Sequence, residues 1–293
     1  MEGFKAFLKR KNIEISAKRY GIDALGAMAQ GLFCSLLIGT IIKTLGQQLS
    51  IQYLIDIGAY AMSVSGPAMA VAIGYALKAD PMVLFSLAAV GWAANAEGGA
   101  GGPLAVLIIA IVAAECGKMV SKETKVDILV TPGTTILIGV ALAKLIAPPI
   151  GTVADTFGNM IDRATYLQPF WMGIAVSVLV GIALTLPISS AAICAVLKMT
   201  GLAGGAAVAG CCAQMVGFAV MSFKENRWGG LVSQGLGTSM LQMPNIVRNP
   251  RIWIPATLAS AITGPIATCV FHLQMNDPAG GVASGMGTCG FVG

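Results

Sequence analysis

The sequence predicts an all-α, polytopic integral membrane bundle of about 8–10 helices with broken or re-entrant segments. Of its 293 residues, 56% are apolar and 11% are charged, and the mean hydropathy is +0.80. Soluble domains carry about 25% charged residues, so a soluble globule is excluded. Runs of roughly 20 apolar residues recur along the chain, as membrane-spanning helices require. The short alternating segments of a β-barrel do not occur.

A basic amphipathic N-terminal segment, residues 1–21, opens the chain. Its alternation of basic and apolar residues favours a helix that lies on the cytoplasmic face of the membrane against anionic lipid. Docking of a partner is the alternative. The segment lacks the apolar run and cleavage site of a secretory signal. Its basic residues are Lys5, Lys9, Arg10, Lys11, Lys18 and Arg19.

Residues 22–293 are predicted to form a transmembrane permease-like domain. A front half, about 22–147, and a back half, about 170–293, are joined by a polar connection, which we expect to run along the outer surface. The predicted spans are 22–46, 51–77, 81–96, 103–120, 127–147, 170–198, 203–222, 231–247 and 252–272. A Gly-rich tail, 273–293, either docks on the bundle or is C-terminally incomplete, and we expect the natural chain to continue.

The basic residues predict the orientation of these spans. With a cytoplasmic N-terminus and every segment crossing, thirteen of the 18 basic residues fall inside and five outside. Cytoplasmic loops of membrane proteins carry such an excess. We therefore expect a multi-pass protein with its N-terminus in the cytoplasm. The five outside residues are Lys43, Lys144, Arg163, Lys224 and Arg227.

Several apolar segments carry interruptions. Residues 81–96 give about 24 Å of helix, less than the roughly 30 Å of a bilayer core, and the turn NAEGGAGGP follows them. The segment 231–247 contains the turn GLGTS, which predicts a helix break at Gly235–Gly237. Thr131–Thr135 and Pro187–Ser190 predict breaks in the fifth and sixth segments. Paired interruptions in two halves indicate a transporter site, although an ordinary proline kink gives the same pattern.

Polar side chains at two of these breaks form the predicted substrate-binding site. Amides and hydroxyls both donate and accept hydrogen bonds, which suits a sugar or polyol. The alternatives are hydrogen bonding between helices and, for the carboxylate, a solvated loop position. A third Gly-Thr turn, GMGTC at 285–289, is expected to meet the same cavity. The predicted site residues are Asn95, Glu97, Gln234, Thr238, Ser239, Gln242 and Asn245.

Catalytic chemistry is not indicated. The chain contains no Ser/His/Asp set, P-loop or H-E-x-x-H motif, and His272 is its single histidine. The seven cysteines show no C-x-x-C spacing, so we expect no metal site and no cofactor. A nucleic-acid partner is not expected either. Glu115 is expected to pair locally with Lys118, one helical turn away.

The stretch GLGTSMLQMPNIVRNPRIWIPATLASAITGPIATCVF, with the following NDPAGGVASGMGTCGFVG and the earlier NAEGGAGGP, resembles the type-2 membrane-component (enzyme IIC) family of the phosphotransferase system. This family includes the perfringolysin O regulator-like membrane proteins. The resemblance implies a permease-like domain in a bacterial inner membrane, a homodimer, and sugar transport coupled to phosphorylation. It also implies separate cytoplasmic phosphotransfer or regulatory partners.

The sequence therefore predicts a bacterial membrane transporter for a small polar solute such as a sugar or polyol. The alternative is a membrane sensor or regulator that binds a small ligand without transporting it. A channel is the third reading, because re-entrant segments also build selectivity filters.

Overall fold

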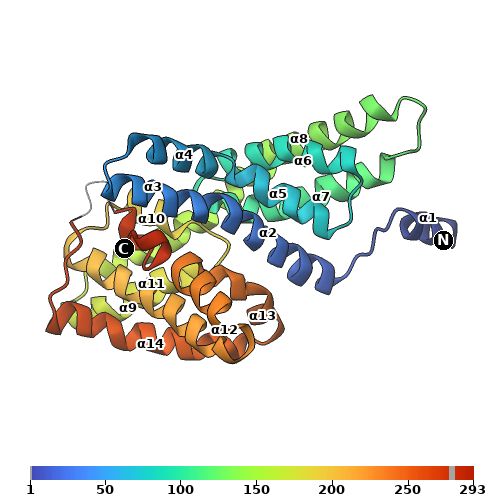
Figure 1. The fold of residues 1–293 in the computed structure, drawn as a ribbon. Helices are drawn as coiled ribbons and strands as arrows, with labels where there is room; N and C mark the ends of the chain where they lie inside the picture. Colours follow the sequence, from blue (N-terminus) through green and yellow to red (C-terminus); the bar gives the residue numbers. More distant parts are fainter. Residues whose placement is uncertain (1, 277–280) are drawn as a thin grey trace. The chain divides into compact units, whose positions relative to one another are not determined.

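The computed structural model of the chain describes residues 2–276 and 281–293. Within these ranges the backbone is mainly helical, no strand occurs, and one isolated antiparallel bridge joins Gly201 and Met275. Five helices are long and apolar enough to cross a membrane, and a sixth span results if the broken pair α4 (Gln52–Ser63) and α5 (Ser65–Ala76) counts as one. The predicted all-α polytopic membrane bundle is confirmed (Figure 1).

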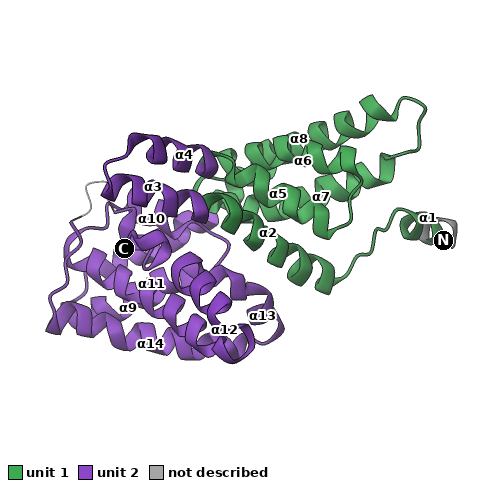
Figure 2. Cartoon of the chain, in the orientation of Figure 1, with its two compact units in different colours: residues 1–36, 63–151 green, residues 37–62, 152–293 purple. Residues whose placement is uncertain are grey.

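The chain folds into two compact units (Figure 2). Unit 1 comprises Met1–Leu36 and Ser63–Gly151, and unit 2 comprises Leu37–Met62 and Thr152–Gly293. A continuous helical stretch, Arg19–Gln48, leads from the first unit into the second. Helix α8 (Asp127–Thr165) does the same at Gly151.

Unit 1 is built around α5, which packs against three partners. These are α2 (Ala24–Leu32), α6 (Pro81–Glu97) and α7 (Gly102–Val120). The unit also contains α1 (Glu2–Arg10), the π-helical turns η1 (Arg19–Asp23) and η2 (Phe33–Leu37), and the 3-10 turn η3 (Gly99–Gly101). Its fully buried core contains Met69, Ile73, Leu77, Val83, Leu87, Val90, Val106 and Ile109.

Small residues let α5 and α6 approach closely. A Cβ atom added at Gly66 would collide with the carbonyl of Gly91, and one added at Gly91 would collide with the carbonyl of Gly66. Lipid tails are as apolar as side chains, so membrane helices associate through close packing of this kind. The reciprocal glycine contact therefore fixes the separation of these two helices.

Unit 2 has a core of three mutually packed helices, α9 (Pro169–Thr185), α11 (Gly201–Met221) and α14 (Trp253–Pro265). Hydroxyl groups connect them. Ser177 Oγ on α9 donates to Ser260 O on α14 at 2.7 Å, and Ser260 Oγ donates to Gly210 O on α11 at 3.1 Å. The remaining helices of the unit are α3 (Ile38–Gln48), α4, α10 (Ser190–Val196), α12 (Phe223–Val232) and α13 (Met243–Arg248). Its short turns are η4 (Ser233–Gly237), η5 (Ser239–Gln242), η6 (Pro250–Ile252), η7 (Ile266–Val270), η8 (Ala283–Gly285) and η9 (Cys289–Phe291).

Exposed apolar side chains recur at helical spacing on the predicted spans. On α14, Ile254, Leu258 and Ile262 are each more than half exposed. On α8, Leu137 and Leu145 are both 73% exposed. A helix face of this kind would be unfavourable in water but matches the hydrocarbon of a bilayer. Both faces therefore suit contact with lipid.

Residues 148–169, the connection expected to run along the outer surface, are helical as far as Thr165, because α8 continues as one 39-residue helix. Ala154 and Ile161 are fully buried, and Gly158 contacts Ile193 of α10. This three-to-four-residue spacing gives the segment a helical face that packs, despite its polar residues. Polar residues on the other faces of this helix conceal the packed face in the sequence.

The predicted break at Thr131–Thr135 was also wrong, whereas the break at Pro187–Ser190 is confirmed. Pro132 lies inside α8 close to its start, so it removes a single backbone hydrogen bond near a helix end and is tolerated. In the back half, α9 ends at Thr185 and α10 begins at Ser190. Ser189 caps α10 by accepting a hydrogen bond from Ala192 N at 3.2 Å.

The N-terminal helix is shorter than the basic segment that predicts it. Helix α1 ends at Arg10, and Asn12 adopts a left-handed backbone conformation with φ 54°. The chain resumes as helix shortly before Arg19, whose buried guanidinium donates to Leu77 O at 2.6 Å. The predicted local ion pair between Lys118 and Glu115 is confirmed, with an N–O distance of 2.9 Å.

The part of the Gly-rich tail that the structure describes packs within unit 2. Ser190 Oγ donates to Gly285 O at 2.7 Å, and Ser284 Oγ donates to Met199 O at 2.6 Å. Residues 277–280 of the motif NDPAGGVASGMGTCGFVG lie outside the described residues. The turn GMGTC is thereby fixed against the core of the unit.

Candidate functional site: an amide-lined cavity in unit 2

The predicted helix break at Gly235–Gly237 is confirmed. Helix α12 passes into η4, Thr238 then adopts an extended conformation, and η5 and α13 follow. The extended residue caps the next turn, because Thr238 Oγ1 accepts a hydrogen bond from Met240 N at 3.1 Å. The break brings the side chains of two turns to one place.

Three amides and one hydroxyl form a directional chain of hydrogen bonds across this break. Asn245 Nδ2 donates to Gln242 Oε1 at 2.9 Å, and Gln242 Nε2 donates to Gln234 Oε1 at 2.9 Å. Gln234 Nε2 then donates to Ser222 Oγ at 2.8 Å. Gln234 and Gln242 are buried, at 3% and 7% exposure. Each link fixes the orientation of the next amide, so the polar groups are pre-organised.

The amide chain lies along two adjoining hollows, which we call the amide cavity. The larger has a volume of about 530 Å³ and the smaller about 380 Å³. Asn226, Gln242 and Asn245 line both. Small-molecule sites typically have volumes of about 300–1,000 Å³ and combine apolar walls with a few placed polar groups. The apolar wall of the larger hollow is formed by Phe218, Met221, Ile252 and Pro255.

Two of the predicted site residues in this unit face the interior instead of the cavity. Ser239 is fully buried and shares a 2.9 Å hydrogen bond with Thr185 at the end of α9. Thr238 is 4% exposed and caps η5. Neither side chain lines the amide cavity. In the described structure both hold the broken segment against the bundle, as the helix-bonding alternative predicts.

The C-terminal turn GMGTC is hydrogen-bonded to the helix break at Gly235–Gly237. Thr288 Oγ1 donates a short hydrogen bond to Gly235 O, inside η4. Gly287 has φ 53°, and a side chain there would collide with the backbone of Cys211 and Cys212. The turn GMGTC therefore meets the turn GLGTS, but none of its residues lines the amide cavity. The third similar sequence, TPGTT, is helical within α8 and is not a turn.

The two remaining predicted residues lie in unit 1. Asn95 is half-buried near the end of α6, and its side chain packs against Gly66 and Gly102. Glu97 is exposed at the end of α6 and has no hydrogen-bond or ion-pair partner among the described residues. The turn that follows packs on α8, where a Cβ atom at Gly101 would meet Ile150 O at 2.8 Å.

Sequence reasoning missed several cavity residues because they lie at or just beyond the end of the predicted span 203–222. Ser222, Glu225 and Asn226 belong to the polar stretch SFKENRW, which is typical of a loop. Arg227, next to Asn226, has φ 51° and ψ −148° inside α12. Non-glycine residues in such a conformation cost about 1–3 kcal/mol and occur mainly at functional sites. The residue types around Arg227 do not predict this backbone conformation.

Two buried polar atoms near the cavity have no hydrogen-bond partner among the described residues. They are Gln214 Oε1 on α11 and Trp253 Nε1 on α14. The amide nitrogen of Gln214 donates to Thr257 Oγ1 at 3.3 Å. Gln214 lies one helical turn before Phe218, and Trp253 follows Ile252, but neither Gln214 nor Trp253 lines either hollow. A water molecule or a ligand hydroxyl would satisfy either atom.

Comparison with known proteins gives one family match. The model of the family described as "Phosphotransferase system, EIIC" matches residues 22–293. No curated protein matches, and no solved structure matches.

Proposed function

The chain belongs to the phosphotransferase system EIIC family, and from this premise we propose that the amide cavity of unit 2 binds a small polyhydroxylated solute, a sugar or polyol, that the protein transports. Membership makes the chain a multi-pass membrane transport component of the phosphotransferase system. The observation that carries the proposed site is the ordered amide chain from Asn245 to Ser222 beside an apolar wall.

The chemistry of the cavity suits neutral hydroxyl groups. An amide presents a donor and an acceptor at a fixed separation, and a sugar hydroxyl can use both. Asn245 is exposed at the cavity, and its Oδ1 is left available because only its Nδ2 is used in the chain. The apolar wall offers a surface for the C–H face of a sugar ring.

The contribution of unit 1 is a separate part of the proposal. Asn95 and Glu97 are proposed as further solute contacts, presented by the turn NAEGGAGGP. Alternating access would then arise from movement of broken segments, as in other transporters with interrupted helices. Thr238 and Ser239 are proposed to affect solute binding indirectly, by holding the broken segment in place.

A binding assay with purified full-length protein tests the site. A panel of radiolabelled sugars and polyols should reveal one ligand that binds saturably, and Asn245→Ala should weaken it about 3- to 10-fold, as for loss of a neutral hydrogen bond. Gln52→Ala is the matched control, because it removes an amide that bonds the exposed Asp56 at 2.8 Å on α4. Unchanged binding in the Glu97→Ala/Asn245→Ala double variant would refute the proposed site.

The placement of the protein in the membrane is also proposed. We expect an N-terminus in the cytoplasm of a bacterial cell, a permease-like domain from residue 22 to 293 after the basic segment 1–21, and a homodimer served by separate cytoplasmic phosphotransfer proteins. The clustering of Arg10, Lys78 and Lys122 at one end of unit 1 supports the cytoplasmic N-terminus. In a variant without native cysteines, Lys9→Cys should react with an impermeant maleimide only in inside-out vesicles.

One observation favours the sensor alternative. The end of α1 is tied to the loop after α7, because Arg10, its last residue, and the following Lys11 pair with Glu123 at 2.7 and 2.5 Å. A tether of this kind could relay a ligand signal to a partner of α1. Deletion of residues 2–9 separates the two functions: a transporter retains solute uptake, whereas a sensor keeps ligand binding and loses its cellular output.

A further inference from the structure

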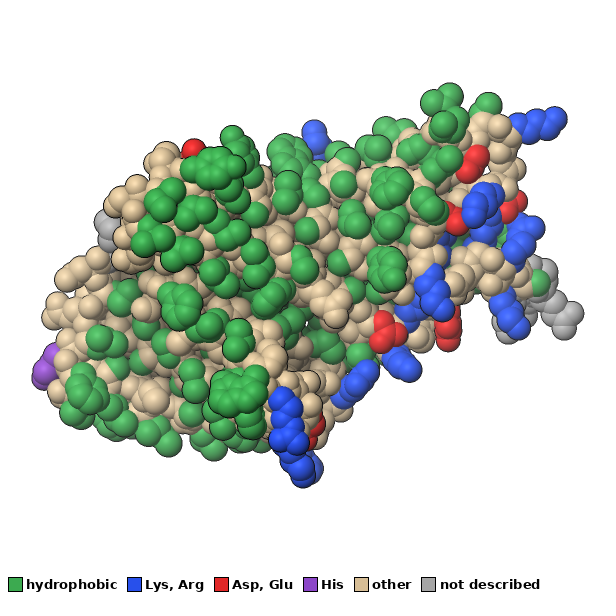
Figure 3. All heavy atoms as spheres, in the orientation of Figure 1, with side chains coloured by type: hydrophobic (Ala, Val, Ile, Leu, Met, Phe, Trp, Pro, Cys, Tyr) green, Lys and Arg blue, Asp and Glu red, His purple; other side chains and the backbone are tan. Residues whose placement is uncertain are grey.

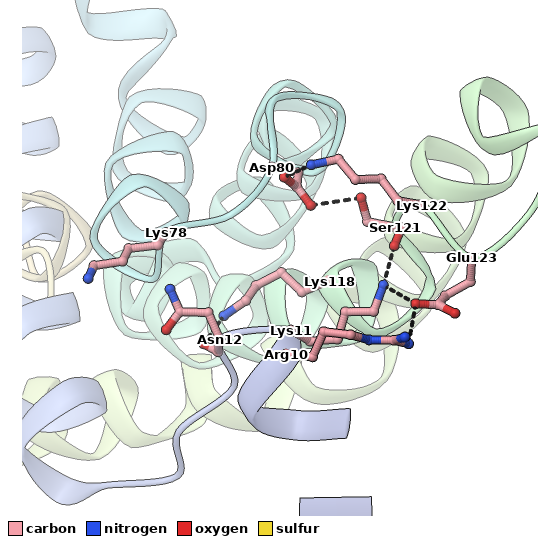
Figure 4. A pocket seen from close by; sticks show the side chains of 9 residues that line it. All are labelled: Arg10, Lys11, Asn12, Lys78, Asp80, Lys118, Ser121, Lys122 and Glu123. Atoms are coloured by element: carbon pink, nitrogen blue, oxygen red, sulfur yellow. Dashed lines mark hydrogen bonds and ion pairs between the residues drawn. The ribbon is translucent and has the colours of Figure 1, made fainter. Parts of the chain in front are cut away.

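A second cavity, which we call the basic pocket, lies within unit 1 (Figure 4). Its volume is about 450 Å³. Three segments form it: the chain after α1, the turn between α5 and α6, and the end of α7 with the loop that follows. Its lining residues are Arg10, Lys11, Asn12, Lys78, Asp80, Lys118, Ser121, Lys122 and Glu123.

Tight turns hold the lining residues in place. Asn12, Lys78 and Lys122 all have left-handed backbones, with φ values of 54°, 55° and 61°. This conformation is uncommon for residues other than glycine. Lys122 N also donates to Asp127 Oδ1 at 2.7 Å, which fixes the loop after α7 at the start of α8. The pocket is therefore made by ordered turns.

A buried layer of hydrogen bonds forms the inner wall. The side chain of Lys118 is 2% exposed. Its Nζ donates to Glu115 Oε2 at 2.9 Å, Asn12 O at 2.8 Å and Leu77 O at 3.0 Å. Arg19 donates to the same Leu77 carbonyl and to Asn12 Oδ1. This layer joins the N-terminal segment to α5 and α7 whether or not a ligand is present.

Positive charge exceeds negative charge in the lining. The five cations are Arg10, Lys11, Lys78, Lys118 and Lys122, and the two carboxylates are Asp80 and Glu123. Glu123 pairs with Arg10 and Lys11, and Asp80 pairs with Lys122 at 2.6 Å. Lys78 has no ion-pair partner among the described residues. Figure 3 shows the surrounding Lys and Arg side chains gathered over the end of unit 1 that carries α1.

The outer ion pairs are the exchangeable ones. The side chains of Arg10 and Lys122 are 62% and 71% exposed. Exposed pairs contribute little, about 0–1 kcal/mol each, so an incoming anion can replace a carboxylate. Arginine binds phosphate through two parallel hydrogen bonds, and lysine binds it as a point charge. A dianion matches the excess of positive charge better than a single carboxylate.

We propose that the basic pocket binds a phosphate group, carried either by a soluble phosphate or by the headgroup of an anionic lipid. Figure 4 shows the charged ends of Lys78, Lys122 and Arg10 pointing apart, so these exposed side chains turn inward to contact the phosphate oxygens. The buried Lys118 layer holds the turns that carry them. The occupied pocket links the N-terminal segment more firmly to α5, α6 and α7, since its ligand bonds to all three segments at once.

Two probes distinguish the sources, both applied to the full-length protein. Inorganic [³²P]phosphate is titrated onto protein in neutral detergent at constant ionic strength. In the second arm, the protein is placed in phosphatidylcholine nanodiscs with and without phosphatidic acid, and retained phosphatidic acid is counted by native mass spectrometry. Saturable binding of phosphate identifies a soluble ligand, and retention of phosphatidic acid alone identifies the lipid.

A charge-matched pair of variants tests the position of the site. Lys78→Gln/Lys122→Gln should weaken the bound probe about 10-fold or more, as expected for two charge-assisted hydrogen bonds to a partly exposed anion. Lys9→Gln/Lys125→Gln removes the same charge from the same end of the unit, outside the pocket lining, and should change binding less than about 2-fold.

Three results would overturn the proposal. They are the absence of saturable binding of both probes, equal weakening by the two double variants, and unchanged binding in Lys78→Gln/Lys122→Gln. Circular dichroism and size exclusion report whether each variant folds. If the double variant does not fold, Lys78→Gln alone decides the question, because Lys78 loses no ion pair when it is replaced.

Discussion

Replacement of Gln242 by alanine tests the amide chain most directly. The variant removes the donor to Gln234 Oε1 and the acceptor for Asn245 Nδ2, both at 2.9 Å. Gln234 is 3% exposed, so water reaches its carbonyl oxygen poorly, whereas Asn245 is exposed and can bond water. An unsatisfied buried acceptor costs about 1–3 kcal/mol. We therefore expect Gln242→Ala to lower the free energy of unfolding by about 1–3 kcal/mol.

The assay is reversible unfolding of the full-length protein in mixed micelles with increasing SDS, followed by tryptophan fluorescence. Asn245→Ala is the matched control, because it removes one end of the chain and leaves Gln242 Oε1 at the cavity, where water can replace the lost donor. It should cost less than about 1 kcal/mol. Equal costs for the two variants would show that the chain is not ordered as described.

Three further predictions concern the tether, the pH dependence and the C-terminal turn. Glu123→Gln should release the end of α1 by removing the ion-pair partner of Arg10 and Lys11. Trypsin should therefore cleave at these residues faster than it does in Glu14→Gln, whose contact with Arg19 spans 3.8 Å. Hydrogen bonding from Lys122 lowers the pKa of Asp80, so its contribution to stability is complete above the unfolded carboxyl pKa of about 4 and is lost as the pH falls through the lower folded pKa. Hydrogen exchange in the loop 121–126 should accelerate in that acid window, and a Lys122→Gln variant with the same acid profile would contradict the assignment. Thr288→Val should weaken solute binding by loosening η4, Thr288→Ser should restore it because it keeps the bond to Gly235 O, and equal binding in both variants would exclude a role for that hydroxyl.

Hydropathy predicted the class of fold and most of the helices. The segments 22–46, 81–96, 103–120 and 203–222 correspond closely to helical stretches of the structure. Apolar runs of this length have few alternatives in a bilayer, where backbone groups must bond within the segment. Hydropathy did not predict that α8 extends through 148–165, because that part of the helix has a single packed face among polar residues and its average hydropathy is low.

Turn chemistry predicted where the candidate site of unit 2 begins and less well which side chains line it. The glycines of GLGTS correctly indicated a break, and Gln234, Gln242 and Asn245 line the cavity beside it. Thr238 and Ser239 have the same polar character but face inward. The direction of each side chain depends on the turn from η4 to η5, which has no sequence period.

For the basic pocket, the sequence likewise predicted which residues share a region but not that they line one cavity. The charge pattern predicted that Arg10, Lys78 and Lys122 lie on one side of the membrane, since cytoplasmic ends collect basic residues. Their meeting in one cavity depends on the left-handed turns at Asn12, Lys78 and Lys122. Asparagine favours the left-handed conformation, but lysine does not, so the residue types do not predict it at Lys78 and Lys122.

The sequence by itself determined that this is a membrane protein and roughly where its helices lie. Both depend on composition within about 20 consecutive residues, because a membrane-spanning segment must be apolar and must form its backbone hydrogen bonds internally. The tertiary structure decided which polar groups meet. Gln234, Gln242, Asn245 and Ser222 form one hydrogen-bonded chain only because α11, α12 and the turns after them are packed together. Such contacts depend on distances between segments, which periodicity along the chain does not encode.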